Sequence, residues 1–422
     1  MTKNYLTYLK KLKENHKTAV KLAWLNPDET VRAEFTNDIY DMSGTLSVNY
    51  QNGSRRSCTI TLNNWDNKFP INYNNIWFNQ KFKLWMGLYL DDATPFYIPQ
   101  GVFYVTNPST VYNPSTRTLK IQGADKWSAL DGTLFGNLTG TYQTNIGTNL
   151  YDATRALLKM SRFHNSFGET DNVLEMLDPI VPILDNSLLN KTVEVNGETH
   201  NVINCPYTAR QEKGKKISDV FLEYATILGA EVYYNTDGRF VYSPLSQTIN
   251  NINDTNKEIL WDFNITEKQM MNIDLSYNFG EVFNDIIILG NIANGYQAKA
   301  RIQNRNPMSD TCVQKIGLKS KEPFESNQYY SDSQCAELGK YYIMNDTIMS
   351  KTGSFSTAPI YHMDVNKFIT LSTQDNNMKK EPFLVNGYTL QISDTSNMSL
   401  DVTSVKELEH LNDFGIVEVT SN

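Results

Sequence analysis

The 422-residue sequence contains little cysteine, little histidine and no long apolar run. Its four cysteines are far apart and form no Cys-x-x-Cys pair, so neither a disulfide framework nor a zinc site is expected. No stretch of 18 apolar residues is present to span a membrane, and the N-terminus lacks the apolar segment of a signal peptide. We therefore expect a protein without a membrane span that folds in a cytoplasm. Its cysteines, expected to be reduced, are Cys58, Cys205, Cys312 and Cys335.

Motifs of catalytic, metal and cofactor sites are also missing. The five histidines do not have the spacing of metal ligands, and there is no Gly-x-Ser-x-Gly, no Walker lysine and no Gly-x-Gly-x-x-Gly. Because these motifs are missing, we expect no enzyme, no metal and no cofactor. Some acidic residues are paired, but acids in polar turns are usually solvated. The carboxylate pairs that would suit glycan hydrolysis are Asp91 with Asp92, Glu322 with Glu325, and Asp364 with Asp375.

The balance of charge is acidic, with a formal net charge of −8. A nucleic-acid-binding protein would carry a basic footprint, so sequence-specific DNA or RNA binding is not expected. A hydrophobic fraction of 40% and a charged fraction of 20% are typical of a folded globular protein. The length allows two to four domains.

The segment 43–131 carries the strongest structural signal. Apolar and polar residues alternate within it, as in 58–62 and 119–122, which predicts strands with one buried face. Turn residues separate the runs, and regular spacing favours a small antiparallel barrel or sandwich. The expected strands are 44–50, 56–62, 82–90, 97–106 and 116–122, joined by 19–25 and 30–35.

Helical periodicity appears in three later segments. We expect helices that begin after Asn149, that run from 216 to 228 and end at Gly229, and that cover 331–349. The basic amphipathic stretch 4–17 is a further helix, which packs on its own domain or contacts a partner.

Aromatic residues gather between positions 65 and 85. They are Trp65, Phe69, Tyr73, Trp77, Phe78, Phe82 and Trp85. One interpretation is a barrel core with its lid, and the other is a face that binds protein or sugar. Trp77 and Phe78 lie in an Asn-rich loop and are expected to be exposed. Arg55 and Arg56 directly precede a strand, where they would either bridge to an acidic neighbouring protomer or be solvated. Arg55, Arg56, Trp77 and Phe78 are therefore the candidate protein-interface residues.

The order of motifs across this segment resembles the first barrel of bacteriophage tail hub proteins, the XkdQ-like baseplate hubs of contractile tails and defective prophages. The C-terminal stretches 362–371, 383–392 and 398–405 are similar to the end of the same proteins, and 282–290 to the strand that opens their second barrel. The motifs of the first barrel are Gly44-Thr-Leu-Ser-Val48, Arg55-Arg-Ser-Cys-Thr-Ile-Thr-Leu-Asn-Asn64, Asp66-Asn-Lys-Phe69, Ile76-Trp-Phe78, Lys83-Leu-Trp-Met-Gly-Leu88, Pro99-Gln-Gly-Val-Phe-Tyr-Val-Thr106 and Gly123-Ala-Asp-Lys-Trp-Ser-Ala-Leu-Asp-Gly132.

The resemblance implies a mainly β fold, with two tail-tube-like antiparallel β-barrel domains (1–135 and 251–422) joined by a mixed α/β middle region (136–250). It further implies a structural hub subunit of a phage, prophage or bacteriocin tail, located in the virion tail tip and assembled in the bacterial cytoplasm. Three copies would form a ring that joins the hexameric tail tube to the trimeric central spike, contacts other baseplate proteins and lines the ejection channel. The alternative is a tail-tip protein that binds glycan or degrades the cell wall.

Overall fold

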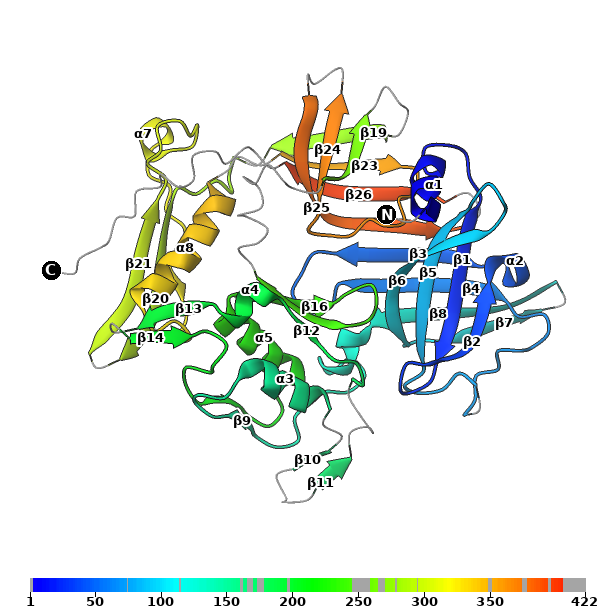
Figure 1. Cartoon of the computed structure of the whole chain (residues 1–422), viewed down its shortest axis with the longest axis horizontal. Coiled ribbons are helices and arrows are strands. Elements are labelled where there is room, and N and C mark those ends of the chain that lie inside the picture. The colour runs from blue at the N-terminus through cyan, green and yellow to red at the C-terminus, as the bar shows by residue number, and fades with distance from the viewer. Residues whose placement is uncertain are drawn as a thin grey trace.

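The computed structural model describes residues 3–73, 75–113, 115–159, 162–164, 170–172, 178–195, 198–244, 259–264, 270–277, 279–293, 295–347, 351–373, 378–393 and 396–404. The fold is mostly β, with helices near the N-terminus, in the middle and in a later insertion (Figure 1). This confirms the predicted fold class. The division into domains 1–135, 136–250 and 251–422 stays a prediction.

One 14-stranded sheet dominates the molecule. Its described strands follow the order β19-β23-β26-β25-β3-β4-β8-β6-β5-β1-β2, with β7 beside β8, β24 beside β25 and β18 beside β24. The strands are β1 (Thr18–Leu25), β2 (Val31–Thr36), β3 (Ser43–Asn49), β4 (Arg56–Asn63), β5 (Lys81–Tyr89), β6 (Pro95–Val105), β7 (Ser109–Asn113), β8 (Thr116–Asp125), β18 (Ile259–Asn264), β19 (Met270–Tyr277), β23 (Lys351–Thr357), β24 (Phe368–Thr373), β25 (Met378–Ile392) and β26 (Met398–Ser404).

The alternation of apolar and polar residues that predicted the N-terminal strands matches the alternation of buried and less buried side chains in the structure. In β4, Cys58, Ile60 and Leu62 point into the core while the residues between them are less buried. All seven strands predicted before residue 125 are present. Strand β7 was not predicted, because all five of its residues are exposed and its sequence has no apolar face.

Strands of both predicted β-barrel domains belong to one sheet. Over the described strands the hydrogen-bonded path ends at β19 and at β2 and does not close on itself. Its two halves are joined by the 15-residue β25, whose first part pairs with β24 and whose last part, from Gly387, pairs with β3. An irregularity between Val385 and Gly387 separates the two parts. The apolar residues of both halves form one continuous core.

The middle of the chain packs helices on short strands. Helices α3 (Leu150–Leu158) and α5 (Ile217–Leu228) share a core with β16 (Ala230–Tyr234) and β17 (Phe240–Pro244). As predicted, Asn149 caps α3, and Gly229 ends α5 with φ +61°. The other elements are η1 (Lys126–Ala129), β9 (Tyr142–Thr144), β10 (Arg162–His164), β11 (Thr170–Asn172), β12 (Ile183–Leu184), α4 (Asn186–Leu189), β13 (Thr192–Val195), β14 (Glu198–Asn201) and β15 (Ala209–Gln211).

Strands predicted to open the second barrel instead form a unit of their own. Strand β20 (Asp285–Ala293) pairs with β21 (Tyr296–Gln303) as predicted, but both belong to a three-stranded sheet with β22 (Phe324–Glu325). Helix α8 (Asp332–Asp346) covers this sheet and shares its core, with α7 (Val313–Ile316) nearby (Figure 1). The unit is inserted between β19 and β23, which pair with each other in the main sheet. We call it the inserted unit.

Helix α1 (Lys3–Lys11) packs on the chain itself. Tyr8 is fully buried, and its hydroxyl lies 2.8 Å from Nδ1 of His362. The short α2 (Asn37–Tyr40) follows β2. Of the helices in the described ranges, none is both long and apolar enough to cross a membrane.

Candidate functional site

Arg55 and Arg56 lie where the main sheet meets the middle region. The β3–β4 connection brings Arg55 to Glu231 of β16, with Nη2 and Oε2 2.8 Å apart and both side chains at most 5% exposed. The Arg55 guanidinium also stacks on the ring of Tyr233 at 3.6 Å. The sequence left two alternatives for this arginine, an acidic neighbouring protomer or solvent, and the carboxylate that binds it instead lies in the same chain.

Arg56 makes a second buried connection from the same turn. Its Nη2 lies 2.5 Å from Oδ1 of Asp364, which comes from the C-terminal part of the chain, and its Nη1 donates to the carbonyl of Tyr234. The two arginines thus tie three segments that are distant in sequence. Neither is solvated, since Arg55 and Arg56 are 4% and 2% exposed.

Asp125 organises the backbone around this junction. Its carboxylate accepts hydrogen bonds from the N–H groups of Arg55, Arg56 and Trp127, and so caps η1. Burial raises the pKa of Asp125, while these N–H donors act in the opposite direction. The role of this carboxylate is to hold the turn and η1 together.

A chain of four buried charges lies beside the arginines. Nζ of Lys126 binds Glu29 at 2.6 Å and Asp178 at 2.8 Å, and Nζ of Lys81 binds the same Glu29 at 2.8 Å. Burial lowers the pKa of Lys81, and Glu29 opposes this shift. The positive and negative charges are equal in number, so the charge of the group is balanced within the chain. Its geometry fixes the middle region on the sheet rather than exposing a reactive group to solvent.

Trp77 and Phe78 are exposed, as the sequence predicted. Their side chains are 44% and 80% exposed, and their rings meet edge to face with centroids 5.2 Å apart. The rest of the predicted aromatic cluster divides between core and surface. Phe69 and Phe82 are buried in the core, whereas Trp65 and Tyr73 are exposed. The protein-interface prediction is therefore carried forward on Trp77 and Phe78.

The candidate carboxylates in the described part of the chain are bound by other side chains or exposed. Asp91 pairs with Lys11 at 2.7 Å, and Asp92 accepts hydrogen bonds from Thr94 within a turn, which lowers its pKa. Asp364 is bound by Arg56, and its proposed partner Asp375 lies outside the described residues. Glu322 and Glu325 are exposed beside β22. Among the described residues, no group of three or more His, Cys, Asp or Glu side chains is placed to hold a metal ion.

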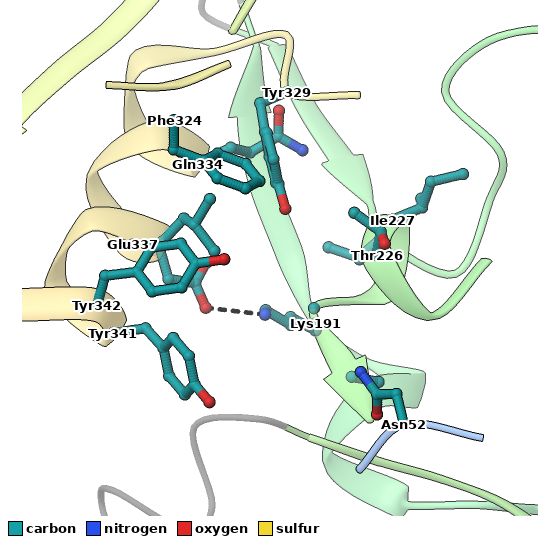
Figure 2. A pocket seen from close by; sticks show the side chains of 14 residues that line it. Asn52, Lys191, Thr226, Ile227, Phe324, Tyr329, Gln334, Glu337, Tyr341 and Tyr342 are labelled. Atoms are coloured by element: carbon teal, nitrogen blue, oxygen red, sulfur yellow. Dashed lines mark ion pairs between the residues drawn. The ribbon is translucent and has the colours of Figure 1, made fainter. Parts of the chain in front are cut away.

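A cleft of about 330 Å³ separates the middle region from the inserted unit. Figure 2 shows the aromatic side chains of one wall, which come from α8 and the segment before it, and the ion pair that crosses the cleft. This pair joins Lys191 to Glu337 at 2.8 Å, and the Glu337 side chain is half exposed. The aromatic wall residues of the inserted unit are Phe324, Tyr329, Tyr341 and Tyr342.

Sequence reasoning missed most of the residues that complete these sites. Glu231, Asp178 and Lys191 are single charged residues in ordinary surroundings, and no local pattern marks them. Asp125 offered a signal, because an aspartate two residues before Trp127 at the end of a strand is typical of a helix cap. Which of these charged residues pair with one another is decided by contacts between segments far apart in the sequence.

Solved structures of phage and prophage tail proteins share this fold along nearly the whole chain. A tail protein from Neisseria meningitidis MC58 aligns with TM-score 0.57 at 10% identity, covering 92% of this chain and 97% of that one. The prophage MuSo2 tail protein from Shewanella oneidensis aligns with TM-score 0.52 at 12% identity, covering 92% and 98%. A prophage tail protein from Listeria monocytogenes EGD-e aligns with TM-score 0.50 at 11% identity, covering 93% and 95%.

No protein-family model matches the sequence, and no curated protein matches it. The comparison therefore rests on structural similarity. At sequence identities of 10–12%, this similarity establishes the fold. The chain has the fold of phage tail proteins. The tail-protein fold that the sequence motifs implied through their resemblance to tail hub proteins is confirmed.

Proposed function

We propose that this protein is a structural hub subunit at the end of a phage-type tail. The observation that carries the proposal is the match of fold over more than nine-tenths of the chain to three tail proteins, each of which is itself covered almost completely. The sequence motifs support it, because they occur in the order expected of a hub. The predicted absence of an enzymatic role belongs to the same proposal.

The finer assignment is a ring of three copies between the hexameric tail tube and the trimeric central spike. A ring that closes needs a heterologous contact, in which different surfaces of successive copies meet. The buried charge pairs at the junction support this role, since a ring subunit must hold its parts in a fixed orientation. The net charge of −8 suits a protein that lines a DNA channel without binding the DNA. We place the subunit in the tail tip of the virion, among other baseplate proteins.

The test is the mass of the purified chain across a concentration series by light scattering, with electron microscopy of the product. A ring of three with an open centre is the expected result. A closed assembly of another number, or co-purification with neither a tube nor a spike protein when the tail proteins are co-expressed, would contradict the proposal.

Glycan binding at the tail tip is the competing function, and the exposed Trp77 and Phe78 are the residues that would serve it. It predicts that Trp77→Ala abolishes retention on bacterial cell-wall preparations and that Asp91→Ala reduces lysis. The hub proposal predicts no retention by the wild-type chain. Saturable wall binding that is lost in Trp77→Ala would decide for the glycan alternative.

A further inference from the structure

We propose that one end of the main sheet docks on a second copy of this chain in a head-to-tail contact. The inference rests on the proposed function, because it assigns a surface and an occupant to the ring contact. We call this surface the aromatic end, defined by Trp65, Tyr73, Trp77, Phe78 and Tyr112. All five are exposed, and Tyr73 and Tyr112 are 82% and 74% exposed. Exposed Trp, Tyr and Phe that gather at one place mark protein interfaces.

The strand registers place these residues at the same end of the sheet. The loop 64–80 joins the end of β4 to the start of β5, and Asn63 pairs with Thr118 near the start of β8. The N–H of Asn64 donates to the carbonyl of Arg117, which binds the β7–β8 hairpin to this loop. Arg32 of β2 donates to the carbonyl of Asn75 at 3.2 Å and attaches the last strand of the sheet.

The aromatic end lies far from the inserted unit. In Figure 1, β2, β5 and β7 lie on the right side of the molecule, and α8, β20 and β21 lie on the left side. A surface at one extremity can reach a neighbouring copy without displacing the middle region or the inserted unit. This position suits a contact between successive members of a ring.

Arg117 holds two of the five aromatic side chains in place. Its guanidinium lies 4.6 Å from the ring of Tyr112 and 5.8 Å from that of Trp65. It donates to the Tyr112 hydroxyl at 3.0 Å and to the Trp65 carbonyl at 3.4 Å, while its buried Nε has no hydrogen-bond partner among the described residues. Side chains that are ordered before binding lose less entropy on docking, which is typical of interface hot spots.

The charge around the aromatic end indicates the occupant. The β1–β2 turn with Arg32, the segment 64–81 and the hairpin segment 109–120 contribute three acidic side chains, Asp28, Glu29 and Asp66, and five basic ones. The whole chain is acidic, so the remainder of a second copy is attracted to this end. Two aromatic ends facing each other would repel, which disfavours a two-fold dimer and favours a head-to-tail contact. The basic residues are Arg32, Lys68, Lys81, Arg117 and Lys120.

The test compares self-association of the full-length chain with that of two double variants by sedimentation velocity. Trp77→Ser with Phe78→Ser removes the two adjacent rings, and Phe279→Ser with Ile292→Ser removes two exposed apolar side chains from the inserted unit. We expect the first variant to raise the dissociation constant about 100-fold or more and the control to leave it within about 3-fold. Because all four side chains are exposed, both variants should retain the wild-type circular dichroism spectrum and melting temperature.

Each other outcome overturns the inference in a recognisable way. Unchanged association of the Trp77/Phe78 variant would show that another surface makes the ring, and the hub function would survive. A product that stops at a dimer would exclude the head-to-tail geometry. A wild-type chain that stays monomeric at every concentration would overturn the ring together with this contact.

Photo-crosslinking gives the arrangement directly. With p-benzoyl-phenylalanine in place of Phe78, we expect adducts to a second copy at residues outside 64–80 and 109–120. Adducts confined to those same residues would indicate a two-fold contact and contradict the inference. The same probe in place of Phe279 serves as the matched control.

Discussion

At the scale of single residues, this protein uses its buried charges to join its own parts. Arg55 and Arg56 are adjacent in sequence, yet Glu231 and Asp364 bind them from two distant segments. Removing water from a charge is costly. A buried arginine that loses its acidic partner therefore strongly destabilises the folded state. The stability of the junction should therefore depend on each partner separately.

We predict that Glu231→Gln lowers the free energy of unfolding by about 3 kcal/mol, because it leaves the buried Arg55 without its counter-charge. The matched control is Glu212→Gln, which breaks the pair with Arg210 in which both side chains are more than half exposed. An exposed pair contributes about 0–1 kcal/mol, so this control should change stability little. Urea unfolding measures both, and equal effects would contradict the prediction.

The four cysteines give a second prediction at this scale. All four are buried, and burial raises the pKa of the Cys58 and Cys205 thiols and raises that of Cys335 to about 12. The folded protein thus keeps these protons while unfolded thiols lose them near pH 9, so these thiols reduce stability as the pH rises above that value. At about pH 8 we expect native Cys58, Cys205 and Cys335 to resist iodoacetamide, since the thiolate is the reactive form.

Mass spectrometry of the alkylated protein tests this expectation, with the urea-denatured chain as the positive control. Alkylation of Cys335 in the native protein as fast as in the denatured one would contradict it.

At the scale of elements, the β3–β4 turn contacts the middle region directly. Gly53 has φ +92°, and its N–H donates to the carbonyl of Val232 in β16 at 2.8 Å. A Cβ atom at this position would lie 2.8 Å from the ring of Trp127, which is itself buried. The turn needs glycine both for its backbone conformation and for this close approach.

We predict that Gly53→Ala destabilises the protein by about 3 kcal/mol, from backbone strain together with the overlap on Trp127. Gly214→Ala is the matched control, because Gly214 has φ +84° and a Cβ atom added there would meet nothing within 4 Å. The control should cost about 1 kcal/mol from strain alone. Thermal unfolding compares the two, and equal losses would show that the Trp127 contact contributes nothing.

At the scale of the whole molecule, the inserted unit is attached to the sheet through two neighbouring strands. Tyr277 of β19 pairs with Lys351 of β23, so the chain leaves and returns at one point of the ladder. The unit has its own core, which includes Ile288, Ile302 and Cys335. Its described contacts with the middle region include the Lys191–Glu337 pair, the Tyr207–Tyr330 rings and the walls of the cleft.

We predict that replacing residues 279–349 by an Asn-Gly turn leaves the main sheet folded, because the connection becomes a hairpin between strands that already pair. Hydrogen exchange should show that β23 and β26 keep their protection, and the shortened chain should still unfold cooperatively. Loss of protection throughout the sheet would mean that the unit is part of the core. Removing residues 136–244, by contrast, should abolish protection throughout the sheet. The deletion removes Glu231 and Asp178, the buried partners of Arg55 and Lys126.

The sequence alone determined the local elements and the class of fold. Alternation and turn residues predicted the strands before residue 125, apart from β7, and periodicity with caps predicted α3, α5 and α8. These succeed because a strand or an amphipathic helix is specified by residues within about ten positions of each other. The same local information predicted that Trp77 and Phe78 would be exposed, and the motif order predicted a tail-protein fold.

Tertiary structure decided how the elements are assembled. The joining of both halves through β25, the separate sheet of β20 and β21, and the burial of Arg55 and Arg56 all depend on partners far away in the chain. A strand's own pattern states that one face is buried, but it does not state which strand lies at its edge. An arginine before a strand is likewise compatible with solvent or with a buried carboxylate. The desolvated surroundings that Glu231 and Asp364 share with these arginines arise only when the chain has folded.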